Sequence, residues 1–188
     1  MMTKSVSFVN VATQMLIEVV LLKQNMAKPV LVTGFEPFGN HSVNISGEIA
    51  RELDGHEIRG HNIQSHVLSV DYEGSILTSQ LLDESSFAAI IHLGLAENAP
   101  FPRIEIRAKD ILDFRIPDNS GRQVIETHIS GEGDLFSTIK PEDWDIETMI
   151  DSPVVSDDAG EYLCNETLYR TLMKINDNTI NEFRIQFF

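Results

Sequence analysis

Short continuous runs of apolar residues are the first regular feature of the chain. Such runs occupy 29–33, 87–96 and the end of 153–156, and each is followed by glycine or by polar residues. A stretch over 63–70 also favours a strand. Continuous apolar runs of this length are typical of strands buried on both faces of a parallel sheet. We therefore predict several buried strands distributed along the sequence.

Helical spacing of apolar residues appears between these strands. It predicts helices from Asn44 or Ser46 to Gly55, from about Tyr72 to Leu82, and from a start near Asp157 or Asp158 to about 176–178. The asparagine, serine and aspartate residues at these starts are good helix N-caps. Strands that alternate with helices predict an α/β fold with a mostly parallel central sheet.

The remaining segments have weaker patterns. Polar and apolar residues alternate over 103–109, which predicts a strand with one polar face. Residues 121–139 contain glycine and predict short strands and loop, 140–151 predict a short surface helix, and 182–188 predict a final strand. Residues 1–27 are apolar with interruptions, and we expect an extension outside the domain that covers 28–188. An added helix and a targeting segment are the alternatives.

Composition excludes several classes of protein. With 188 residues, 42% of them hydrophobic, the chain is long enough for one domain with a full core. A formal net charge of −15 argues against nucleic acid or an anionic membrane as a partner. One cysteine excludes an intramolecular disulfide and fits a reducing compartment, so we expect a cytoplasmic protein.

The only cysteine, Cys164, lies where strand 153–156 leads into the last predicted helix. Unpaired backbone N–H groups and the helix dipole favour a thiolate at a helix start, and a lowered pKa makes cysteine a nucleophile. A lone cysteine is more often a small buried hydrophobe, so position alone leaves both interpretations open. The histidines at 56, 61 and 66 do not form a metal motif, because odd spacing in an extended strand puts His61 and His66 on opposite faces and no further ligand lies at a usual interval.

The segment Ser156-Asp-Asp-Ala-Gly-Glu-Tyr-Leu-Cys-Asn165 resembles the nucleophile segment of the pyroglutamyl peptidase I (pyrrolidone-carboxylate peptidase) family. Gly34-Phe-Glu-Pro-Phe-Gly-Asn-His-Ser-Val-Asn-Ile-Ser46 resembles the family's opening Gly-Phe-x-Pro-Phe-Gly-Gly…Asn-Pro-Ser. Here Asn40 replaces the second glycine and Ile45 replaces the proline. The resemblance implies that Cys164 is the nucleophile, that Phe35 and Phe38 form the walls of a lactam pocket, and that Asn44 helps to close it.

Two further motifs extend the resemblance. Gly94-Leu95-Ala96 resembles the family's Gly-x-Ala at the pocket edge, where backbone groups contact the lactam. Asp113-Phe-Arg-Ile-Pro-Asp-Asn119 resembles Asp-Ala-Arg-Ile-Pro-Asp-Asn, which places Arg115 on the arginine near the oxyanion site. Counting back without a gap places Glu105 on the catalytic glutamate, although here Ile106 separates it from the arginine that directly follows it in the family.

The resemblance implies a three-layer, phosphorylase/hydrolase-like α/β fold and a cysteine exopeptidase that removes N-terminal pyroglutamate from peptides. It implies no metal or organic cofactor, and a homo-oligomer, often a tetramer. In the family the base is a histidine about two dozen residues after the cysteine, whereas all six histidines here precede Cys164. We therefore expect a domain cut short of its base and impaired in activity, with His128 as a conceivable substitute. The alternative is an inactive relative that only binds pyroglutamyl peptides.

Overall fold

The structure is a computed structural model that describes residues 28–96, 99, 102–138, 154–177 and 185–187. The predicted extension at 1–27 and the predicted helix at 140–151 lie outside these residues. No helix in the described part of the chain is long and apolar enough to cross a membrane.

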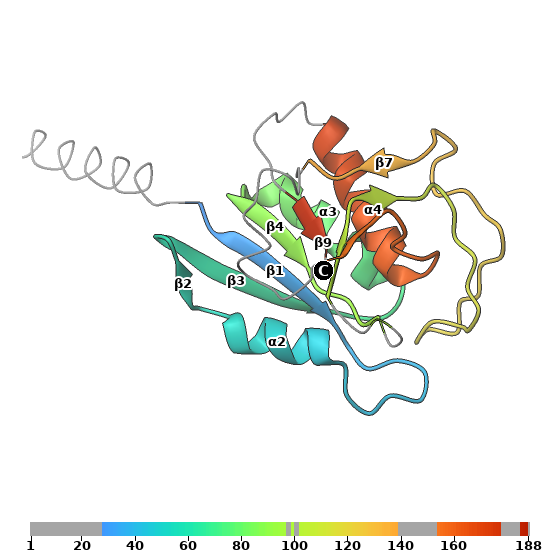
Figure 1. Ribbon diagram of the computed structural model, residues 1–188, viewed down its shortest axis with the longest axis horizontal. Helices are drawn as coiled ribbons and strands as arrows, with labels where there is room; N and C mark the ends of the chain where they lie inside the picture. Colours follow the sequence, from blue (N-terminus) through green and yellow to red (C-terminus); the bar gives the residue numbers. More distant parts are fainter. Residues whose placement is uncertain (1–27, 97–98, 100–101, 139–153, 178–184, 188) are drawn as a thin grey trace, which may run out of the picture.

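A central sheet of seven strands organises the molecule (Figure 1). Its order is β2 (Glu57–Ile58), β3 (His61–Leu68), β1 (Val30–Phe35), β4 (Ala89–His92), β9 (Ile185–Phe187), β5 (Arg103–Glu105) and β8 (Val154–Ser156). The four strands β3, β1, β4 and β9 are mutually parallel. β5 is antiparallel to β9 and parallel to β8. The mostly parallel sheet predicted from the sequence is confirmed.

Helices cover both faces of this sheet, which gives three layers (Figure 1). α2 (Ile45–Leu53) packs on β1 and β3, and its Ala50 meets Val30, Val32 and Ile63 of the sheet. α3 (Tyr72–Glu84) and α4 (Leu163–Asp177) pack on each other over the opposite face, around the larger core cluster. The alternating sides of β1 explain both cores, since Leu31 joins one cluster and Val32 the other.

Two of the three predicted helix starts are confirmed. Asn44 caps α2 by accepting a hydrogen bond from Ser46 N–H, and Asp71 caps α3 by accepting one from Gly74 N–H. The prediction for the last helix is wrong, because α4 begins at Leu163 and neither Asp157 nor Asp158 caps it. The Asp158 carboxylate instead accepts the Gly160 N–H at 3.0 Å and pairs with a lysine described below.

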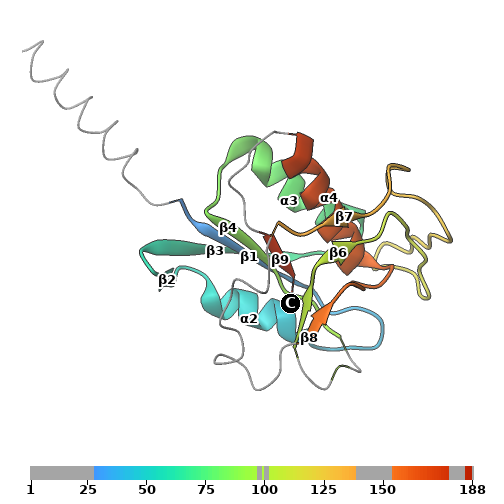
Figure 2. The same ribbon diagram turned by 45° about the horizontal axis from the view of Figure 1, so that its top comes forward.

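The stretch 103–109 is not one strand, as the alternation predicted. β5 ends at Glu105, and β6 (Arg107–Ala108) leaves the main sheet to pair with β7 (Leu135–Phe136) in a second, two-stranded sheet (Figure 2). Ile106 is the crossing point: its N–H donates to Ser156 O at 2.8 Å and its carbonyl accepts the Ser137 N–H at 2.9 Å. The alternation of polar and apolar residues does not reveal this change of pairing partner, because both β5 and β6 are strands.

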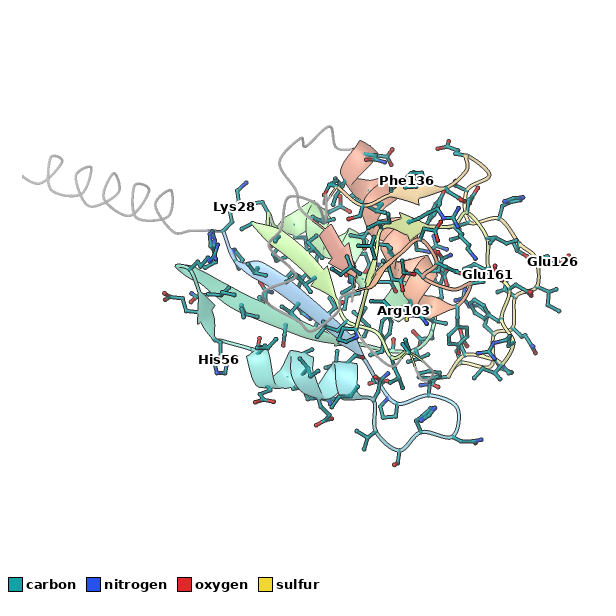
Figure 3. The ribbon with its side chains drawn as sticks, viewed as in Figure 1. Lys28, His56, Arg103, Glu126, Phe136 and Glu161 are labelled. Atoms are coloured by element: carbon teal, nitrogen blue, oxygen red, sulfur yellow. The ribbon has the colours of Figure 1, made fainter. Side chains whose placement is uncertain are left out.

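Residues 119–134 form a long loop, and β7 is the strand that follows it in the stretch where short strands and loop were expected. The buried carboxylate of Asp110 holds one end of this loop by accepting backbone N–H groups from Ile129, Ser130 and Gly133. Glu126 lies on the outer side of the loop, far from the central sheet (Figure 3).

Gly34 lets the chain that follows β1 return over its own strand. A Cβ atom at this position would lie within overlap distance of the Ser46 carbonyl and 2.7 Å from the Gly47 nitrogen, both of them backbone groups. Because a backbone cannot retreat as a flexible side chain can, this position accepts only glycine.

We predict that Gly34→Ala lowers the free energy of unfolding by at least about 3 kcal/mol, because the clash is with backbone in a packed region. Gly55→Ala is the control: it has positive φ but no heavy atom within 4 Å of the added Cβ. That variant loses about 1 kcal/mol from its left-handed conformation alone. Equal losses in urea denaturation would contradict the assigned close approach.

Candidate active site

The predicted glutamate, Glu105, lies where several strands of the central sheet end. Glu105, the last residue of β5, lies opposite Ser156 of β8 and opposite Phe187 of β9. Phe187 in turn lies opposite His92, the last residue of β4. Ligands in open α/β sheets bind outside the carboxyl ends of strands, and this edge is therefore the expected place for a site.

Cys164 is the second residue of α4 and packs against the larger core cluster. Burial raises the pKa of its thiol from 9.0 to about 12, and the charge of the nearby Glu105 carboxylate acts in the same direction. The expected position in the first helical turn is confirmed. The expected lowering of the thiol pKa is wrong, because desolvation outweighs the helix terminus in this environment.

Glu105 is 7% exposed, and burial raises the pKa of its carboxyl group. The Ser156 hydroxyl and the Asp158 backbone N–H oppose that rise by hydrogen bonding to the carboxylate. Its Oε2 atom has no hydrogen-bond partner among the residues that the structure describes. A buried carboxylate oxygen of this kind is a ready acceptor for one more N–H or O–H donor.

The residues predicted to form the walls of the pocket have different surroundings. Phe35 is not an exposed loop residue: it ends β1 and is buried in the core, 3% exposed. Phe38 is partly buried, and its ring centroid lies 6.0 Å from that of Tyr162. Asn44 is buried, and its amide donates to Glu36 O at 3.1 Å while its carbonyl oxygen accepts from Ser46. Asn44 therefore fixes the shape of the loop that carries Phe38.

Tyr162 is an aromatic wall that the sequence interpretation did not single out. Its ring contacts Phe38 on one side and packs edge-on against Phe114 on the other, with 4.7 Å between the second pair of centroids. Its hydroxyl donates to Pro117 O at 3.2 Å. We call Phe38, Phe114 and Tyr162 the aromatic cluster. It joins the loop after β1, the Arg115 motif and the approach to Cys164.

The other predicted site residues lie around this cluster. Leu95 is half-buried in the loop after β4, at the same edge of the sheet as the loop after β1. Arg115 is exposed and directly follows Phe114. His128 is not placed as a substitute base, because its side chain is 72% exposed and bonds the Asp110 carbonyl at 2.7 Å. No described group of three or more histidine, cysteine or acidic residues is arranged to hold a metal.

A buried charge network supports the aromatic cluster, and the sequence patterns did not reveal it. Glu166, two residues after Cys164, has a fully buried side chain that pairs with Arg122 at 2.6 Å and with Arg170 at 2.7 Å. Arg122 also pairs with the buried Asp118 at 3.0 Å, and its guanidinium lies 5.0 Å from the centre of the Phe114 ring. The i, i+4 spacing of Glu166 and Arg170 on one helix is the one sequence signal for this network. Spacing does not reveal Arg122, because it is 44 residues from Glu166 in the sequence.

Asn165 anchors the first turn of α4 from another direction. Its side-chain oxygen accepts the Lys109 N–H at 2.8 Å, and its amide donates to Lys109 O at 2.9 Å and Ile111 O at 3.0 Å. Three hydrogen bonds from one fully buried side chain leave little freedom to the neighbouring Cys164.

A cysteine at a helix start, a buried glutamate beside it and an aromatic cluster at the edge of an α/β sheet define the class of cysteine peptidases on an α/β scaffold. The sequence profile described as pyroglutamyl peptidase matches residues 28–187. The chain belongs to the pyroglutamyl peptidase family.

Individual relatives agree with this assignment. The chain is 35% identical over 150 residues to the pyrrolidone-carboxylate peptidase of Thermococcus litoralis, covering 77% of this chain and 68% of that protein. It is 36% identical over 156 residues to the corresponding protein of Chromobacterium violaceum, with 77% and 71% covered. A crystal structure of pyrrolidone carboxyl peptidase from Pyrococcus furiosus superposes with a TM-score of 0.77 at 31% identity, covering 85% of this chain and 79% of that one.

We predict that iodoacetamide modifies Cys164 slowly and in a strongly pH-dependent way. A thiol pKa of about 12 instead of 9.0 leaves about a thousandfold less thiolate near pH 8, and the rate should rise about tenfold per pH unit from pH 7 to 9. Intact-mass measurement reads this rate without ambiguity because the chain has one cysteine. Glutathione is the reference thiol, and a plateau below pH 9 would contradict the role given to burial.

We predict that Glu166→Gln lowers the free energy of unfolding by about 3 kcal/mol, because it removes one partner from a buried ion network and leaves two arginines without their shared carboxylate. Glu48→Gln is the matched control, since Glu48 makes an equally short pair with Arg51 on the exposed surface of α2. Its loss is about 0.5 kcal/mol or less. Urea denaturation measures both, and similar losses in the two variants would contradict this account.

Proposed function

We propose that the protein is a cysteine exopeptidase that hydrolyses the bond after an N-terminal pyroglutamyl residue of peptides. Membership of the pyroglutamyl peptidase family carries this proposal. The position of Cys164 and Glu105 at one edge of the sheet supports it, because these two residues match the nucleophile and the glutamate expected from the motifs.

In the proposed reaction the Cys164 sulfur attacks the carbonyl carbon of the pyroglutamyl residue and loses its proton to a base. The tetrahedral intermediate then expels the amine of the following residue, which takes up a proton, and water releases pyroglutamate from the thioester. We assign Arg115 and nearby backbone N–H groups to the stabilisation of the oxyanion. The exposed position of Arg115 beside the aromatic cluster is compatible with contact to a bound peptide.

The lactam ring of the substrate is flat, uncharged and without a free amine. Its proposed site is bounded by Phe38 and Tyr162 of the aromatic cluster, with backbone groups around Leu95 supplying hydrogen bonds. Phe35 supports the wall from the core, and Asn44 fixes the loop. An apolar slot with a few fixed polar groups suits such a ring better than an acidic pocket, which would select a charged amine.

The proton of the thiol needs an acceptor, and an imidazole held by Glu105 would supply one. Oε2 of Glu105 has no hydrogen-bond partner among the described residues, so it offers an acceptor for an imidazole N–H. No histidine follows Cys164 in the sequence. Position 188 is the one to test, because it directly follows Phe187, which lies opposite Glu105.

The assay that tests this function measures fluorophore release from a pyroglutamyl-amide substrate. We predict slow release by the chain as it stands, none above background by Cys164→Ser, and an increase of about 10²- to 10⁴-fold in Phe188→His, the range that general-base assistance supplies. The double variant that combines Phe188→His with Cys164→Ser is the control for the gain.

If Phe188→His and the double variant released the fluorophore at equal rates, Cys164 would lose its assigned role. Absence of release in every variant would overturn the proposed activity. The cytoplasmic location and the homo-oligomeric state expected from the resemblance stay predictions.

A further inference from the structure

The segment that leads to Cys164 rests on three residues of the stretch that includes the end of β5 and β6, namely Glu105, Arg107 and Lys109. Each of the three contacts residues 156–161. After Ser156 these residues belong to no helix or strand. Glu105 lies opposite Ser156 in the pairing of β5 with β8, and the Ser156 hydroxyl oxygen accepts the Asp158 N–H at 3.2 Å.

Lys109 contacts two carboxylates of this segment. Its ammonium group lies 2.8 Å from the Asp158 carboxylate and 3.2 Å from that of Glu161, and its side chain is only 20% exposed. The hydrogen bond with Lys109 lowers the pKa of Asp158, and the same bond raises the pKa of Lys109. Both charges are therefore present across the neutral range. Figure 3 labels Glu161, which comes just before α4.

Arg107 fixes the start of the same segment. Its Nε donates to Asp157 O at 2.8 Å, and its terminal nitrogens lie 3.7 Å from the Asp157 carboxylate and 3.5 Å from that of Asp134. A bond to a backbone carbonyl fixes the path of the chain in a way that a contact between two mobile side chains does not.

Attachment continues on the other side of the segment. The Asp113 N–H donates to Glu161 O at 3.0 Å, and Asn165 bonds the backbone at Lys109 and Ile111. Cys164 is thus held from both sides by the single stretch 105–113, the same stretch that carries Glu105. The separation of nucleophile and glutamate depends on these attachments.

Solvent exposure separates this positioning role from a role in overall stability. The Asp157 and Asp158 side chains are 72% and 57% exposed. Ion pairs with such exposure contribute little to global stability, because water and salt screen them. Their loss is therefore small for the whole fold, yet it releases a segment that has no secondary structure to hold it.

We propose that Arg107 and Lys109 are positioning residues, which hold the acidic segment Asp157–Glu161 against the stretch that carries Glu105 and thereby fix Cys164 beside that glutamate. The proposal deepens the function assigned above and rests on it for its effect on turnover.

The test is alkylation of Cys164 by iodoacetamide at pH 8, followed by intact mass, in the full chain. Lys109→Met loosens the segment and lets more water reach the thiol, so we expect alkylation to become roughly fivefold faster, the factor equivalent to an exposed pair at the upper end of its range. Lys109→Arg keeps the charge and should remain near the original rate. The double variant Lys109→Met, Asp158→Asn should be alkylated no faster than the faster of its two single variants. The reason is that both substitutions remove the same contact, the one between Lys109 and Asp158.

Arg51→Met is the matched control, since it removes the Arg51–Glu48 ion pair, 2.6 Å long, from α2 on the other face of the sheet. We expect its alkylation rate to be unchanged. An unchanged rate in Lys109→Met would overturn the proposal. So would a faster rate that is fully accounted for by a lower urea midpoint, because global unfolding would then expose the thiol.

Turnover supplies the second readout. In the Phe188→His background, Lys109→Met should lower kcat roughly fivefold with KM within about twofold, because the nucleophile and not the lactam pocket is displaced. A change confined to KM would overturn the positioning role. If no variant releases the fluorophore, the proposed peptidase activity fails, while the alkylation result still decides whether Arg107 and Lys109 fix the thiol.

Discussion

The architecture of the site depends on the burial of one carboxylate, that of Glu166. A buried charge is costly unless it is paired, and here two arginines from different parts of the chain supply the pairing. Because Glu166 follows Cys164 by two residues, the same pairs that satisfy this charge fix the start of α4. The network therefore joins α4 to the long loop that carries Arg122.

Arg122 transmits this constraint to the aromatic cluster. Its guanidinium packs on Phe114, and Phe114 packs on Tyr162, which contacts Phe38 in the loop after β1. Asn165 anchors the same helical turn to the stretch after β5. Charge pairing, aromatic packing and buried hydrogen bonds thus all involve the first turns of α4 or the residues just before it. Together they hold the loop after β1, the long loop with Arg122 and the stretch after β5 around Cys164.

The fold could be predicted well from the sequence because the strands of a parallel sheet and amphipathic helices have clear periodicities. The start of α4 and the break at Ile106 escaped prediction, because loop geometry and exchange of strand partners leave no periodic signal. Motifs placed Cys164 and Glu105 at one edge of the sheet, where the structure also has them. The thiol pKa was predicted in the wrong direction, since burial is a tertiary property that the local helix start does not reveal.

The burial of Cys164 also governs how the chain responds to oxidants. Hydrogen peroxide reacts with thiolates to give sulfenic acid, and a thiol whose pKa is about 12 presents almost none at neutral pH. We therefore expect the only sulfhydryl group of the chain, which is partly buried against the core, to react with peroxide more slowly than an exposed cysteine. The apolar surroundings that raise its pKa would thereby also keep it in the reduced form.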